Sequence, residues 1–141
     1  MNVATSDIGR AVNSPHYFLY RALDPLKVFL DDKAVTEIAI NRPGSVYVER
    51  LGADFMEHHR IESLTADEIQ NIGERVAGVT SQFISRANPI LSAALPSGER
   101  IQVILPPAAP DGGAISIRKQ VVSNFTLEHY RDTDRKSTRL N

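Results

Sequence analysis

Residues 89–107 read PILSAALPSGERIQVILPP, and residues 115–119 read ISIRK. In both runs apolar residues alternate with polar or small ones, which is the pattern of strands buried on one face. A Pro-Ser-Gly-Glu turn divides the first run, and the proline pair at 106–107 begins a loop that leads to the second. The pattern therefore predicts a hairpin followed by a third strand of the same sheet.

The alternation also assigns the side chains of these strands to faces. The core face carries Ile101 and Val103 in the strand over 100–105, and Ile115 in the strand over 114–119. Arg100 and Arg118 then lie on the opposite, polar face. A guanidinium is a permanent planar cation whose five donors fit carboxylates and phosphates. Two of them on one polar face predict an anion-binding site formed by Arg100 and Arg118.

The same arginines also allow a purely structural interpretation. Each lies at a strand end, where it can pair with Glu49, Glu99 or another carboxylate, and most surface ion pairs do no more than this. The residue types alone leave both interpretations open.

A first helical segment and a second group of strands are predicted before residue 62. Residues 16–32 carry apolar side chains at spacings of three and four, and Asp24-Pro25 predicts either a kink or a new helix start there. Residues 35–40 and 45–50 are predicted strands joined by a turn at 41–44, and a third strand is expected over 55–61.

A longer helix is expected from Thr65 to a stop at residues 88–89. Thr65 and Glu68 fit a capping box, in which each side chain satisfies a free backbone amide of the other residue. Gly73 and Gly78 each weaken a helix by about 1 kcal/mol relative to alanine, although a glycine also permits close packing. The apolar stripe expected to cover the sheet consists of Ile69, Ile72, Val76, Val79 and Phe83.

The order of these elements predicts the fold class. Helix, strands, helix and strands follow one another with connections too short for parallel crossovers, which favours an α+β domain. We expect a mostly antiparallel sheet of about six strands, with the helices packed on one face. The chain has 141 residues and is 42% hydrophobic, which suits one domain with its own core.

Composition limits the classes of function. The 16 basic and 17 acidic residues leave a net charge of −1, which argues against a general nucleic-acid or anionic-membrane surface, so any phosphate recognition must be local. The chain has no cysteine, and this favours a reduced, cytoplasmic setting without a disulfide framework. Residues 1–14 contain no apolar run, so we expect a disordered lead-in and neither a signal peptide nor a membrane span.

The last eight residues are expected to be foreign to the protein. Residues 134–141 read DRKSTRLN, which resembles one frame of a common sequencing adapter and has no hydrophobic period. Without them, 13 basic and 16 acidic residues remain, a net charge of −3. The native sequence after Thr133 would then be missing; the alternative is a genuine basic tail, and sequencing the gene past that codon separates the two.

Catalytic and metal-binding motifs are sparse. Of the four histidines, only His58 and His59 are adjacent, and neighbouring side chains of a strand face opposite ways, so they are not expected to share a metal ion. No Gly-rich phosphate loop of the Gly-x-x-x-x-Gly-Lys-Ser/Thr type and no nucleophile–base arrangement occurs in the sequence. We therefore assign no catalytic residue to this chain.

Over roughly residues 19–119 the chain resembles the N-terminal domain of the VirB-type traffic ATPases of type IV secretion. The resemblance rests on several ordered motifs: LKVFLDD at 26–32, TEIAINRPG at 36–44, the run at 91–107 with LPSGERIQ inside it, and SIRK at 116–119.

The resemblance implies a function and a domain organisation. Members of this family are hexameric cytoplasmic rings at the inner-membrane base of a secretion or conjugation channel, and each subunit holds ATP and magnesium between an N-terminal domain and a RecA-like motor domain. By motif, Arg100 and Arg118 match arginines of the N-terminal domain that reach the nucleotide phosphates. Residues 15–122 would be that domain and residues 123–133 the start of the interdomain linker. The motor domain is absent from this sequence, so tight ATP binding by the chain alone is not expected.

A second hypothesis belongs to another class. The chain could be a stand-alone α+β sensor or protein-interaction module without ATPase activity. A phosphate-loop motif within about one domain length downstream in the gene would favour the secretion ATPase, and its absence would favour the module.

Overall fold

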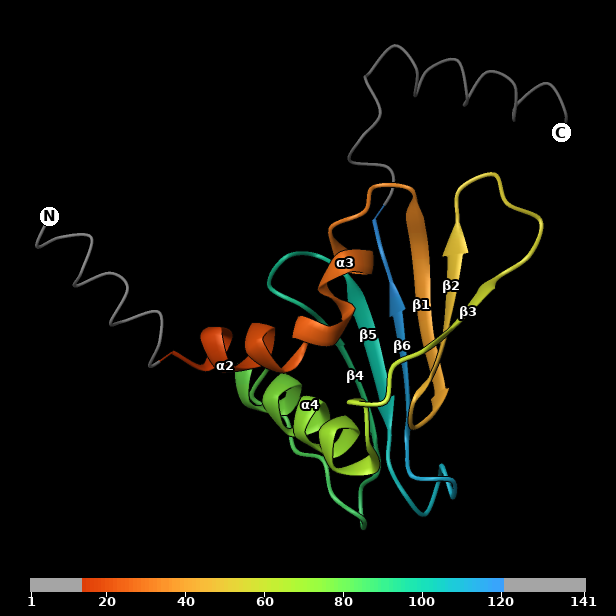
Figure 1. The fold of residues 1–141 in the computed structure, drawn as a ribbon. Coiled ribbons are helices and arrows are strands. Elements are labelled where there is room, and N and C mark those ends of the chain that lie inside the picture. The colour runs from red at the N-terminus through yellow and green to blue at the C-terminus, as the bar shows by residue number, and fades with distance from the viewer. Residues whose placement is uncertain (1–13, 121–141) are drawn as a thin grey trace, which may run out of the picture.

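An antiparallel sheet of six strands organises the structure. The computed structural model describes residues 14–120, and its strands lie in the order β3-β2-β1-β6-β5-β4 (Figure 1). The helical elements are α2 (Pro15–Ala22), the 3-10 helix η1 (Asp24–Leu26), α3 (Lys27–Leu30) and α4 (Ala66–Val79). The strands are β1 (Val35–Arg42), β2 (Ser45–Arg50), β3 (Glu57–Arg60), β4 (Ile90–Ala94), β5 (Arg100–Ile104) and β6 (Ala114–Arg118).

This architecture confirms the predicted α+β class with an antiparallel sheet of six strands. The predictions for residues 1–13 and 121–141, which include most of the lead-in, the linker start at 123–133 and the foreign run at 134–141, lie outside the described residues.

The first helical segment is divided where the sequence predicted. The side chain of Ser14 caps α2 by accepting a hydrogen bond from the Tyr17 amide at 3.1 Å, and Pro15 occupies the first turn. The helix ends at Ala22, with Leu23 as its C-cap, and Asp24-Pro25 starts the short η1 turn that leads into α3. Proline has no amide hydrogen to continue the α2 hydrogen bonds, so the chain changes direction there.

Two three-stranded meanders join through one edge strand of each, β1 and β6, to form the sheet. β1, β2 and β3 form the first group, and β4, β5 and β6 form the second. The two groups join because β6 pairs antiparallel with β1, residues about 80 positions apart in the sequence. Figure 1 shows β6 lying between β1 and β5. No local signal in the sequence predicts that pairing.

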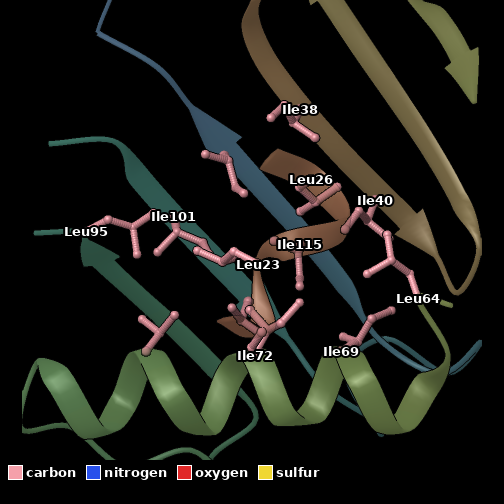
Figure 2. Close-up of a cluster of buried hydrophobic side chains, with 14 of the residues drawn as sticks. Leu23, Leu26, Ile38, Ile40, Leu64, Ile69, Ile72, Leu95, Ile101 and Ile115 are labelled. Atoms are coloured by element: carbon pink, nitrogen blue, oxygen red, sulfur yellow. The ribbon is translucent and has the colours of Figure 1, made fainter. Parts of the chain in front are cut away.

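The core lies between one sheet face and the helices. Alternate residues of the central strands are buried, as the period of two predicted. Figure 2 shows the apolar side chains from the helical layer meeting those of the sheet, among them Leu23, Leu26, Ile69, Ile72, Ile38, Ile40, Ile101 and Ile115. The other face of the sheet is therefore free to present polar side chains.

The long helix ends earlier than predicted, and this corrects the assignment of Phe83. The sequence extended the helix to residue 88, but α4 ends at Val79, and Phe83 lies beyond it with 86% of its surface exposed. The end is set by Ser81, whose φ of 55° is left-handed, and by a bond from the Gln82 amide to the Ala77 carbonyl at 2.9 Å. This is a Schellman-type stop that usually uses glycine, so hydrophobic periodicity did not reveal it.

Smaller differences concern strand ends and the helix cap. β1 continues through Arg42 into the predicted turn, which leaves Pro43 and Gly44 as the turn, and β3 is shorter than the predicted 55–61 segment. Of the predicted capping box, the bond from the Glu68 amide to the Thr65 hydroxyl is present at 3.2 Å. The reciprocal bond to the Glu68 carboxylate is not among the contacts of residues 14–120.

Candidate functional site

Arg100 and Arg118 lie directly opposite one another on neighbouring strands. In the antiparallel pair of β5 and β6, Arg100 is the register partner of Arg118, and Gln102 is the partner of Ser116. Both arginines are exposed, and the residues that alternate with them, Ile101 and Ile117, are buried. The structure thus brings the two predicted site residues together on the polar face.

The arginines belong to a row of charges that crosses four strands. Arg118 on β6 is the register partner of Glu37 on β1, and Glu37 is the partner of Glu49 on β2. The row therefore runs Glu49, Glu37, Arg118, Arg100, with the acidic half on β2 and β1 and the basic half on β6 and β5. Opposed side chains of this kind are close enough to interact.

The structure contains one ion pair of the kind that the structural interpretation expects, although not with Glu49 or Glu99. Arg118 Nη2 lies 3.5 Å from Glu37 Oε1, so one arginine does have a carboxylate partner. The two carboxylates named in advance are engaged elsewhere: Glu49 accepts a bond from the Thr36 hydroxyl at 2.7 Å, and Glu99 accepts one from the Ser97 hydroxyl at 2.5 Å. Within residues 14–120, Arg100 has no ion pair.

A shallow hollow of about 360 Å³ accompanies the arginines on this face. Apart from Ile101, its lining side chains are polar or small, and both guanidinium groups are among them. The lining residues include Ser92, Ala94, Gln102 and Ser116 besides the two arginines. The hydroxyl and amide groups add hydrogen-bond donors beside the two cations.

The turn that precedes Arg100 is held in place by a contact from α2. The Ser97 amide donates to the Tyr20 hydroxyl oxygen at 3.0 Å, and the hydroxyl groups of Tyr20 and Ser97 lie 2.6 Å apart. Gly98 has a φ of 107°, a backbone conformation that residues with a side chain rarely adopt. The Pro-Ser-Gly-Glu sequence thus forms a turn that is anchored 77 residues away along the chain.

The lysine that follows Arg118 turns away from the hollow. Lys119 Nζ donates to the backbone carbonyl of Phe29 at 3.1 Å and to that of Asp32, at the end of α3. Burial lowers the pKa of Lys119 below its ordinary value, against the opposing effect of nearby carboxylates, chiefly that of Asp32. Lys119 therefore fixes the end of β6 to the helical layer, and of these two neighbouring basic residues only Arg118 lines the hollow.

A second and larger hollow, of about 1050 Å³, lies between the first helical segment and the turn at 97–99. Its lining mixes both charge signs, including Arg21 and Lys27 with Asp24 and Asp31, and Lys27 is already paired with Asp31 at 2.6 Å. Size alone would favour this hollow over the one at the arginines. We favour the smaller one because like charges converge there without full neutralisation.

The histidines of β3 do not form a shared site. His58 contacts the Ser45 hydroxyl at 2.9 Å, whereas His59 contacts Glu57 at 3.0 Å and packs against Phe29 on the other face. Over residues 14–120 no group of three or more metal-ligating side chains is found. None of the helices in that part of the chain is long and apolar enough to cross a membrane.

Glu37 is the site residue that the sequence analysis missed. Its place on the polar face follows from the alternation in residues 35–40, in which Ile38 and Ile40 are the core residues. Its contact with Arg118 depends on the pairing of β1 with β6, for which the sequence offered no local signal.

Comparison with known proteins reveals clear relatives. The type IV secretion system protein VirB11 of Brucella suis is 41% identical over 109 residues, and that of Bartonella quintana is 44% identical over 107 residues. Protein VirB11 of Agrobacterium fabrum is 35% identical over 98 residues. These alignments cover 69–77% of this chain and 28–30% of the relatives. No protein-family model matches the chain.

The fold has a solved counterpart of the same name. The VirB11 ATPase of the Brucella suis type IV secretion system, solved in complex with sulphate, superposes with a TM-score of 0.77 and 36% identity. The match covers 89% of this chain and 37% of that structure. The chain thus spans about 30% of the length of its curated relatives. Over the part that it shares with them, the chain is a homologue of the VirB11 proteins of type IV secretion systems.

Proposed function

We propose that residues 15–122 are the N-terminal, ring-forming and nucleotide-sensing domain of a hexameric ATPase that powers type IV secretion or conjugative DNA transfer. In this proposal, Arg100 and Arg118 face the phosphates of an ATP whose magnesium and main phosphate cradle belong to a motor domain beyond this chain. The assembly would work on the cytoplasmic side of the inner membrane, against components of the secretion channel.

The observation that carries the proposal is the register of Arg100 opposite Arg118. Like charges directly opposite one another on antiparallel strands are unfavourable, so this arrangement is not one that stability alone favours. Glu37 neutralises only one side of the pair, at 3.5 Å from Arg118. An anion with several oxygens would remove the repulsion and bind to both guanidinium groups, which present paired N–H donors suited to phosphate.

Such a site suits nucleotide sensing because the charge of the bound nucleotide changes when its terminal phosphate is removed. Cations beside the terminal phosphate interact differently with ATP and ADP, and only a difference of this kind can bias a domain arrangement. The kinship with VirB11 proteins supports a secretion role, and the open polar face supports an interface with a second domain.

The test is turnover by the longer protein, with this domain joined to its motor domain. Arg100→Ala and Arg118→Ala are each expected to lower ATP turnover by about 10- to 100-fold, because each removes a charge that faces the transferred phosphate. Arg60→Ala is the matched control, since it removes an exposed guanidinium on β3 whose partner is Glu62, at 3.6 Å.

The outcomes separate the hypotheses. Wild-type turnover in both site variants would remove the arginines from the nucleotide site. If the gene downstream of this chain encodes no phosphate-loop motif, the ATPase assignment fails and the stand-alone module is favoured instead.

A further inference from the structure

Glu37 contacts the two arginines through one long ion pair, which it makes with Arg118. Its carboxylate lies 3.5 Å from Arg118 Nη2, and within residues 14–120 it makes no other ion pair. The Arg118 side chain is 76% exposed, whereas that of Glu37 is 27% exposed. The arginine is therefore free to move into solvent, and the carboxylate is the more fixed partner.

The Arg118 guanidinium cannot make full hydrogen bonds to the Glu37 carboxylate and to a phosphate at the same time. A guanidinium that turns to bind a phosphate through paired N–H donors gives up its contact with the carboxylate, and the two anions repel one another when both stay close. Glu37 is then left half-buried without its partner, which costs free energy. An incoming anion must offset that cost.

We propose that Glu37 is a positioning residue of the anion site: it holds Arg118 beside Arg100 while the site is empty and is displaced from Arg118 when a phosphate binds. This inference rests on the phosphate-facing role proposed above. Its consequence is that Glu37 weakens phosphate binding, so that the ligand is held less tightly and released more readily.

The experiment titrates the 141-residue chain with sodium tripolyphosphate and measures its dissociation constant by NMR. Glu37→Gln keeps the size of the side chain and removes its charge. We expect it to tighten binding by about two- to fivefold, the scale of an exposed ion pair. The matched control is Glu49→Gln, which removes the same charge one strand further along the row, where the carboxylate is bound to Thr36 instead of Arg118. It should change the dissociation constant less than Glu37→Gln does.

A double-mutant cycle isolates the contact. In an Arg118→Ala background, Glu37→Gln should tighten tripolyphosphate binding no more than Glu49→Gln does in the same background. The reason is that Glu37 can no longer compete with the phosphate for Arg118. A further readout needs no variant: in the wild-type chain the carboxyl ¹³C resonance of Glu37 should move together with the Nε–H resonance of Arg118 as tripolyphosphate is added. A Glu37 resonance that stays still while that of Arg118 moves would contradict displacement.

The results distinguish this inference from the function on which it rests. If Arg100→Ala and Arg118→Ala both leave tripolyphosphate binding unchanged, or if the wild-type chain shows no saturable binding, the anion site itself is refuted. If both arginine variants weaken binding and Glu37→Gln equals Glu49→Gln, only the role of Glu37 is refuted.

Discussion

Gly73 and Gly78 both lie inside α4, and the sequence gives no reason to treat them differently. Their surroundings in the structure differ. A Cβ atom at Gly73 would lie 3.1 Å from Val103 Cγ1 and 3.4 Å from Ile84 Cδ1, whereas a Cβ at Gly78 would meet nothing within 4 Å. Gly73 therefore lets α4 approach β5 closely, and Gly78 contributes no comparable packing. Both glycines have ordinary helical backbone angles, so only the neighbours distinguish them.

Alanine substitution should consequently act in opposite directions at the two positions. Gly78→Ala is expected to raise the free energy of unfolding by about 0.5–1 kcal/mol, since it removes the helix penalty of glycine at no steric cost. Gly73→Ala is expected to lower it by about 1 kcal/mol, because overpacking outweighs the same gain. Urea denaturation of the two variants measures the difference, and equal stabilisation by both would show that α4 has room to shift away from β5.

Arg50 links three elements at the end of the sheet where α3 meets β1. Its guanidinium lies 2.5 Å from Asp32, in the loop after α3, and 2.6 Å from Glu57 on β3. Hydrogen bonding to Arg50, with help from the Ala34 amide, holds the pKa of Asp32 below its ordinary value of 3.8. Bonds from His59 and Arg50 hold the pKa of Glu57 below 4.5.

These lowered pKa values make stability depend on acid. A carboxylate with a lowered pKa in the folded state contributes stability above its unfolded pKa, and that contribution is lost as the pH falls through the folded value. We therefore expect the free energy of unfolding to fall below about pH 4.5, and Arg50→Gln to lower it at about pH 7 while reducing this acid sensitivity.

Urea denaturation of the wild type and Arg50→Gln at about pH 7 and about pH 3 tests the prediction. Lys27→Gln is the control, because it breaks a pair with Asp31 in which both side chains are about two-thirds exposed, and such pairs contribute little. An Arg50→Gln variant with the same loss of stability in acid as the wild type would show that the two carboxylates owe their pKa values to other contacts.

All the buried apolar residues of the described core lie between Leu19 and Ile117. We therefore predict that residues 14–122 alone unfold at the same temperature, within a few degrees, as the 141-residue chain. A shorter chain of residues 14–112 lacks β6, which joins β1 to β5, and should not fold cooperatively. Thermal unfolding followed by circular dichroism measures both. A large loss of stability in the 14–122 chain would show that the domain boundary lies further along.

The sequence predicted most of the local structure of this protein, and the reason is physical. Burial on one face imposes a period of two on β5 and β6, and a proline interrupts the helix hydrogen bonds after Leu23. Each of these features depends only on residues that are close together in the sequence. The predicted helix stop at residues 88–89 was wrong, because α4 ends at Val79 before a left-handed Ser81 and a serine in that conformation leaves no mark in the hydrophobic pattern. The face that presents Arg100 and Arg118 followed from the same period of two.

Local pattern thus determined which side chains are buried and which face water, since that choice is made within a few residues. Only the tertiary structure decided that β1 and β6 are neighbours and in which register β5 pairs with β6. The pairing of β6 with β1 brings Glu37 within 3.5 Å of Arg118, and Arg100 faces Arg118 because β5 and β6 share one register. Contacts across about 80 residues depend on how the whole core packs, and no short window of sequence contains that information.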